Sequence, residues 1–155
     1  MLKSKLESLK AYLIESGEAE KTELEAVTVE NSYNENFNTF EVIGNEYKVL
    51  TDAEADEEAK SEILNSLWAF NGDFILRHTE FYKTSSDRED TEFIDSLQEL
   101  QSNICESANS IVKALIVDID TFIEDAIESD GRGHFISWYD GKEEEQGEFF
   151  IYRTN

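Results

Sequence analysis

The sequence predicts a single α+β domain over residues 1–155, in which a long C-terminal core helix and shorter helices pack on a small antiparallel sheet of two β-hairpins. Apolar residues recur every three or four positions over most of the chain, which is the helical period. Two stretches rich in β-branched and aromatic residues flank glycine turns, as hairpins do. No proline interrupts the 155 residues, which favours long helices.

The charge of the chain is strongly one-sided. Thirty-six Asp and Glu residues stand against 13 Lys and Arg, a net charge of −23. Such a surface repels nucleic acid and anionic membranes and attracts basic protein surfaces. A hydrophobic fraction of 39%, with 12% aromatic residues, supplies enough bulk for a folded core and argues against disorder.

The first 17 residues predict an amphipathic helix. Its apolar face is formed by Leu2, Leu6, Leu9 and Leu13, and it ends near the Ser-Gly pair at 16–17. Two interpretations stay open: the helix packs on the core, or it is peripheral and docks on a partner, including a second copy in a homodimer through these four leucines. No continuous apolar run follows, so we expect neither a signal peptide nor a membrane span.

A hairpin and a capped helix follow an asparagine-rich loop. Residues 39–43 and 46–50 read as strands around a Gly44-Asn45 turn. Thr51 and Glu54 then form a capping box, the signature of a helix start. That helix places apolar residues on one face and crowds carboxylates over its first three turns.

The longest helical pattern covers residues 91–129, where apolar positions step by three or four without a glycine or proline. One straight helix and a bent one are both compatible with it, and its C-terminal half is predicted to be the central core helix. Cys105 falls in this apolar row, so we expect a buried, inert thiol. Beyond the Asp130-Gly131 cap, residues 135–139 and 148–152 predict the second hairpin, with residues 140–147 as its solvated tip.

Two groups of residues could carry function. Asp130, Arg132 and His134, with two glycines between them, offer an acid, an anion clamp and a titratable base; the alternative is a glycine cap leading into a strand. The larger group consists of carboxylates on the two acidic helices. Its members are Asp52, Glu54, Asp56, Glu57, Glu58, Glu62, Asp118, Asp120, Glu124, Asp125 and Glu128.

The acidic helices do not predict a metal centre. Asp120, Glu124 and Glu128 share one helix face, but no glycine turn follows to make a calcium loop, and the single cysteine excludes a cysteine-based zinc site. We therefore expect a solvated acidic face, no metal and no cofactor. Trp68, Trp138 and the aromatic run at 149–152 are interpreted as core residues rather than as stacking platforms for bases.

Three segments carry a resemblance to a known family. Residues 49–56 (VLTDAEAD), 66–71 (SLWAFN) and the closing DGRGHF…YDG…FIYR are similar to small acidic proteins encoded by tailed bacteriophages and prophages. The resemblance covers roughly residues 40–155, and the N-terminal 30 or so lie outside it. It implies a phage-borne accessory protein and transfers no catalytic residue.

Three functions follow as hypotheses. Some small acidic phage proteins imitate DNA to block host enzymes, so by analogy we expect an acidic inhibitor that occupies a basic surface on a host nucleic-acid-binding or defence protein. The first alternative is a protein–protein interaction or assembly module without mimicry. The second is a small enzyme that uses His134. All three place the protein in the cytoplasm of a bacterial host, with no direct nucleic-acid partner.

Overall fold

A computed structural model describes residues 1–155 and confirms the α+β class. The chain forms two compact units, each described by itself below. Unit 1 comprises residues 1–59 and 130–155, and unit 2 comprises residues 60–129. The chain leaves unit 1 within helix α4 (Asp52–Asn65) and re-enters it at the last residue of α8 (Ile119–Asp130).

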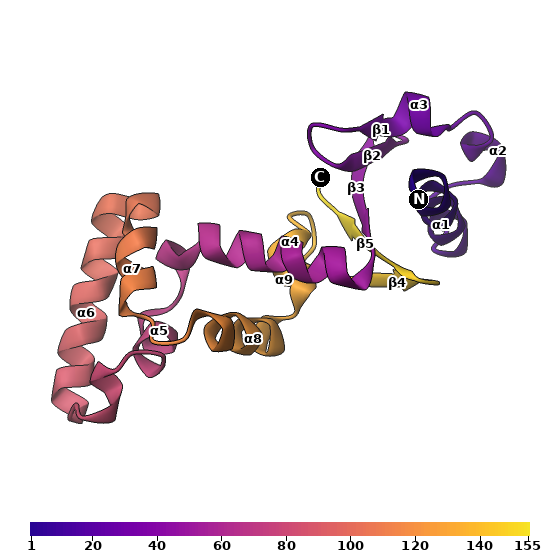
Figure 1. Ribbon diagram of the computed structural model, residues 1–155. Helices are drawn as coiled ribbons and strands as arrows, with labels where there is room; N and C mark the ends of the chain where they lie inside the picture. The colour runs from indigo at the N-terminus through magenta and orange to yellow at the C-terminus, as the bar shows by residue number, and fades with distance from the viewer. The chain divides into compact units, whose positions relative to one another are not determined.

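Unit 1 is built on a five-stranded antiparallel sheet (Figure 1). The strand order is β1-β2-β3-β5-β4, so the two hairpins β2–β3 and β4–β5 are joined through the pairing of β3 with β5. The strands are β1 (Tyr33–Asn34), β2 (Thr39–Val42), β3 (Asn45–Leu50), β4 (Glu144–Gln146) and β5 (Phe149–Arg153). The remaining helices of the unit are α1 (Leu2–Glu15), α2 (Lys21–Leu24), α3 (Val29–Ser32) and α9 (Arg132–Ile136).

The leucine face of α1 forms part of the core of unit 1. Leu6, Leu9 and Leu13 are at most 2% exposed and pack in one cluster with Phe40 and Tyr47 of the sheet, while Leu2 packs against this cluster. The helix ends at Glu15 with Ser16 as its C-cap, next to the Ser-Gly pair where the end was predicted. Leu6, Leu9 and Leu13 are therefore used for packing within their own chain, whereas Leu2 is only partly buried.

The first hairpin is confirmed with its turn one residue earlier than expected. Val42 pairs with Asn45, so the two turn residues are Ile43 and Gly44, both at positive φ (51° and 74°). Two consecutive positive φ angles characterise the type I′ turn, whose twist matches that of the flanking strands. The prediction placed the turn at Gly44-Asn45 because glycine and asparagine are the residues most common in such turns.

The second hairpin is confirmed only in its last strand. Residues 132–136 form helix α9 and residues 138–140 a turn, so the strand expected at 135–139 is wrong. The partner of β5 is instead β4, from the acidic stretch expected to be a solvated tip. β4 is an edge strand, where charged residues are well tolerated because one side of the strand stays in water.

Unit 2 is built from helices, with one isolated antiparallel β-bridge between Thr79 and Ile116. It contains the C-terminal part of α4, most of α8, and between them η1 (Leu67–Ala69), α5 (Gly72–Arg77), η2 (Phe81–Lys83), α6 (Asp87–Ile104), η3 (Cys105–Ala108) and α7 (Asn109–Leu115). Helical residues run without a gap from Asp87 to Leu115, about 29 residues, but not as one straight rod. A second break, at residues 116–118, separates α7 from α8.

The bend lies at Cys105. This residue adopts φ 48° and ψ −126°, outside the helical region, and α7 does not continue the axis of α6 (Figure 1). Cys105 is exposed, so the expectation of a buried thiol is wrong. The apolar period continues through the bend, since Leu97, Ala108 and Val112 are all buried, and the period alone could not reveal that the backbone turns there.

The aromatic residues divide between core and surface. Phe149 and Tyr152 are buried as expected, while Trp68 and Phe150 are half-buried. Trp138 is 74% exposed, so its assignment to the core is wrong: the turn after α9 carries it outward instead of a strand carrying it inward. None of the helices is both long and apolar enough to cross a lipid bilayer.

Candidate functional site

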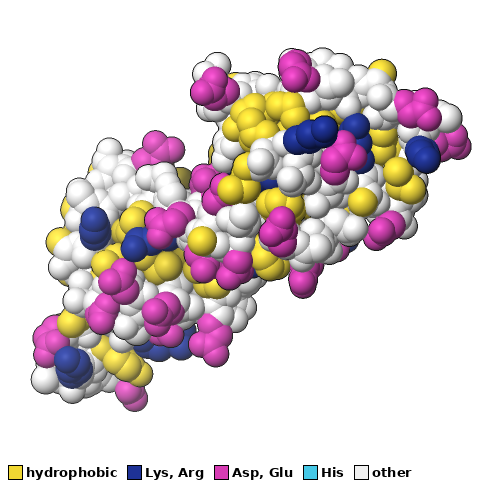
Figure 2. Space-filling model, turned by 45° about the vertical axis from the view of Figure 1, so that its right-hand side comes forward, with side chains coloured by type: hydrophobic (Ala, Val, Ile, Leu, Met, Phe, Trp, Pro, Cys, Tyr) yellow, Lys and Arg dark blue, Asp and Glu magenta, His cyan; other side chains and the backbone are white.

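Carboxylates dominate the surface of the protein. Figure 2 shows acidic side chains spread over the face drawn, not gathered in one block, with basic side chains fewer. With 36 acidic and 13 basic residues, most carboxylates must remain without a cation of their own. The useful distinction is therefore between carboxylates that the fold has already paired and those that it leaves to solvent.

The first turns of α4 have their carboxylates paired within unit 1. Four of the six acidic residues predicted to contact a partner are in ion pairs: Asp52 and Asp56 with Arg132, Glu54 with Lys5, and Glu58 with Lys48. The capping box is present, since the Thr51 amide donates to Glu54 Oε2 at 2.8 Å. Burial raises the pKa of Glu54, but the hydrogen bonds from Thr51 and the hydrogen bond and charge of Lys5 together outweigh it, so the pKa is lowered. Glu57 and Glu62 make no ion pair.

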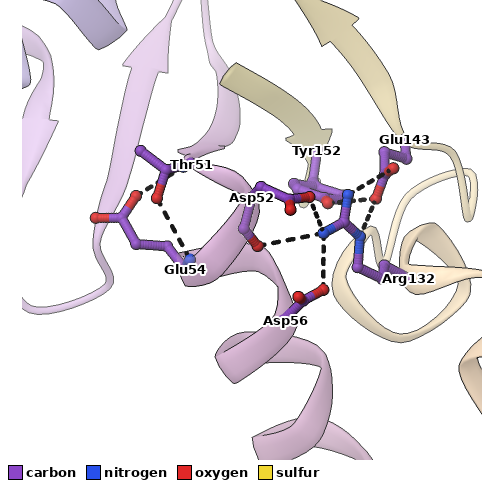
Figure 3. A network of polar contacts seen from close by, with 7 residues as sticks. All are labelled: Thr51, Asp52, Glu54, Asp56, Arg132, Glu143 and Tyr152. Carbon is purple, nitrogen blue, oxygen red and sulfur yellow. Dashed lines mark hydrogen bonds and ion pairs between the residues drawn. The ribbon is translucent and has the colours of Figure 1, made fainter. Parts of the chain in front are cut away.

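Arg132 is the centre of a polar network in unit 1 (Figure 3). Its Nε and Nη2 donate to the two oxygens of Glu143 at 2.9 and 3.0 Å, and Nη1 donates to Asp52 and Asp56 at 2.8 Å each. The guanidinium also lies 4.5 Å from the centre of the Phe150 ring. The hydrogen bonds to Glu143 make the largest contribution to raising the pKa of Arg132. Its side chain is 11% exposed, and each of its three nitrogens donates to a carboxylate of unit 1.

The group predicted around Arg132 does not converge on one point. His134 is exposed, and its ring packs edge-on against Phe135. Gly133 is buried where a Cβ would lie 2.5 Å from the carbonyl oxygen of Gly141, so the glycine is required for the backbone of residues 141–143 to pass. Gly131 is therefore followed by helix α9 and not by the strand of the structural alternative, and Arg132 is used in contacts within unit 1.

The carboxylates on α8 are less engaged. Asp118 caps the helix by accepting the amides of Asp120 and Thr121, and these hydrogen bonds, the one from Thr121 foremost, lower its pKa. Asp120 lies 3.5 Å from Lys60. Glu124 and Glu128 are exposed and make no ion pair.

Asp125 has a partner that the sequence did not suggest. Its Oδ2 lies 3.3 Å from Nε2 of His78, the first residue after α5. The His78 ring packs against Phe74 and Phe122, with centroid distances of 5.1 and 5.0 Å. Burial lowers the pKa of His78, against the opposing influence of Asp125. The two residues are 47 positions apart in the sequence, and only the packing of α5 on α8 brings them together.

A small pocket in unit 1 is lined by side chains that hydrogen-bond to one another. It measures about 160 Å³ and contains Glu18, which accepts from the hydroxyls of Tyr12 and Tyr47 at 3.2 Å each. Burial, first, and the nearby Glu18 raise the pKa of both tyrosines, which therefore remain protonated donors. Arg153 stacks on Tyr139 at 3.8 Å and lies 4.0 Å from Glu18.

No group of three or more histidine, cysteine or acidic side chains is placed to hold a metal ion. The site that remains is a surface of unpaired carboxylates on α6 and α8. No protein-family model, curated protein or solved structure matches this chain.

Proposed function

We propose that this protein acts by binding, as an acidic ligand of a basic surface on another protein, in the manner of a nucleic-acid mimic. The observation that carries the proposal is the set of exposed carboxylates on α6 and α8. Asp95, Glu99, Glu124 and Glu128 are exposed and make no ion pair. A helix holds such groups about one turn apart on a stiff backbone. Little conformational entropy is therefore lost when a partner binds.

The class of partner follows from the charge. A groove that binds DNA or RNA is lined with Lys and Arg, and a preorganised array of carboxylates competes for the same cations. A host nucleic-acid-binding or defence protein is the partner that this chemistry favours. The proposal narrows the predicted contact surface, because the acidic residues at the start of α4 are tied to Arg132, Lys5 and Lys48.

The test is a pull-down from bacterial lysate with two challenges. Retained proteins are eluted by a salt gradient and, in a parallel sample, by a 20-base-pair DNA duplex. We expect a partner that leaves early in the gradient and is displaced by the duplex. The charge-reversed variant Glu124→Lys/Glu128→Lys should lose it. The matched control, Glu25→Lys/Glu35→Lys, makes the same change of charge at exposed acidic residues of unit 1 and should keep it.

A specific observation favours the alternative of an interaction module without mimicry. Trp138 and Tyr139 are 74% and 56% exposed on a turn held by hydrogen bonds from the Ser137 hydroxyl to Asp140 and to the carbonyl oxygen of Arg153. Exposed aromatic residues on a rigid support are frequent anchors of protein interfaces. A partner that resists both salt and the duplex but is lost on Trp138→Ala would establish this alternative and contradict mimicry.

A further inference from the structure

A group of facing polar and aromatic side chains outside the Arg132 network lies between α5 and α8. These two helices border a hollow of about 400 Å³ in unit 2, lined by Phe74, Arg77, His78, Asp125, Glu128 and Ser129. Its walls combine an aromatic ring with two carboxylates one helical turn apart. This combination suits a planar cation, which can stack on the ring while donating to carboxylate oxygens.

We infer that this hollow receives an arginine side chain of the basic partner, an inference that rests on the proposed function. Asp125 and Glu128 are three residues apart on α8, so their carboxylates are neighbours on one face of the helix. The guanidinium has five donors in a planar fork, enough to serve both carboxylates, and it can lie beside the Phe74 ring that lines the hollow.

The charges around the hollow leave room for a second cation. Arg77 is the one basic residue in its wall, and its guanidinium pairs with Asp73 at 2.9 Å. It also lies 5.9 Å from the centre of the Phe74 ring, which shows that this part of the surface already accommodates a guanidinium beside an aromatic ring and a carboxylate. Glu128 makes no ion pair, so its charge is available.

His78 keeps the hollow acidic. Its lowered pKa leaves the imidazole neutral at neutral pH, so the ring orients Asp125 without cancelling its charge. The Phe74 and Phe122 rings hold the imidazole in place from two sides. An incoming guanidinium would therefore meet Asp125 already positioned by a neutral neighbour.

The probe for the test is Nα-acetyl-arginine amide, titrated into the whole protein and followed through the ring signals of His78 and Phe74 by NMR. We expect saturable shifts confined to the residues of the hollow. Nα-acetyl-lysine amide should bind about threefold or more weakly, since the ammonium lacks the flat face and the fork. Shifts spread evenly over all acidic residues would overturn the inference.

Matched variants separate the hollow from the general acidity of the surface. Glu128→Gln should weaken binding of the arginine probe about fivefold or more, whereas Glu99→Gln on α6 should change it less than about twofold, since only local carboxylates contact the cation. Both residues are exposed and make no ion pair, so neither change threatens the fold. Equal weakening by both variants would refute arginine binding in the hollow, while leaving the proposed function as an acidic ligand intact. Loss of the lysate partner is scored separately and tests the function itself.

Discussion

Replacement of Arg132 by alanine tests whether the core of unit 1 depends on its polar network. The change removes a cation that is 11% exposed and leaves three carboxylates, those of Asp52, Asp56 and Glu143, facing one another without it. It also removes the contact with the Phe150 ring. We therefore expect a marked loss of stability from the replacement of a single charged residue.

The magnitude follows from the exposure of each partner. The side chain of Glu143 is 28% exposed, so its two-point contact with a charged donor is worth about 1.5–3 kcal/mol. The side chains of Asp52 and Asp56 are 74% and 61% exposed, so solvent screening limits each of their ion pairs to about 0.2–1 kcal/mol. Together with the ring contact, the loss on Arg132→Ala should be about 3 kcal/mol, a large part of the 5–15 kcal/mol typical of a whole protein.

The assay is urea unfolding followed by far-ultraviolet circular dichroism on four proteins: wild type, Arg132→Ala, Glu143→Gln and the double variant. The double variant should be more stable than Arg132→Ala alone, because the uncompensated carboxylate is gone. Arg132→Lys should recover part of the loss, since it restores the charge but not the fork. A loss below about 0.5 kcal/mol for Arg132→Ala, with no coupling to Glu143, would refute the reasoning.

Three further outcomes are expected. Gly133→Ala should destabilise by about 2–3 kcal/mol, because its Cβ would meet a backbone oxygen at 2.5 Å, whereas Gly131→Ala, which meets no atom, should cost about 1 kcal/mol for its positive φ; urea midpoints compare them. Because the pKa of His78 is lowered in the folded protein, the unfolded chain binds the proton at higher pH, and the free energy of unfolding decreases as pH falls below about 6.5. The variant His78→Phe should therefore lose less stability between pH 7.5 and 5.5 than the wild type. Glu58→Lys should cost about 2 kcal/mol because it sets two cations against each other, while Glu57→Lys, at an exposed position, should stay within about 0.5 kcal/mol.

Patterns with a local physical cause were predictable from the sequence. The leucine face of α1, the capping box of α4 and the β2–β3 hairpin depend on residues a few positions apart, and each is present. The prediction of the closing hairpin was wrong because the mixed polar and apolar residues of α9 are compatible with a helix and with a strand. The requirement for glycine at position 133 arises only in the folded chain, where the backbone of residues 141–143 passes close to it.

The candidate site shows the same limit. Composition revealed that carboxylates would cover the surface, but not which ones the fold would pair. Lys5 and Glu54 are 49 residues apart in the sequence and Arg132 and Asp52 are 80 apart, so no periodicity connects them. His78 and Asp125 meet only through helix packing. The division between paired and unpaired carboxylates is a tertiary property. It removed the start of α4 from the predicted contact surface, kept α8 and added α6.

The discontinuity of unit 1 has a consequence for the order in which the protein can fold during its synthesis. β3 ends at Leu50, and its neighbour β5 begins at Phe149, so the whole of unit 2 is translated between two strands that pair directly. At about 5–20 residues per second, β3 waits several seconds with one edge open while unit 2 leaves the ribosome complete. Arg132, which ties the start of α4 to the β4 loop, also arrives in this last stretch. The sheet therefore closes last, and a chain truncated before residue 149 and released from the ribosome should contain a foldable unit 2 beside an unfinished unit 1.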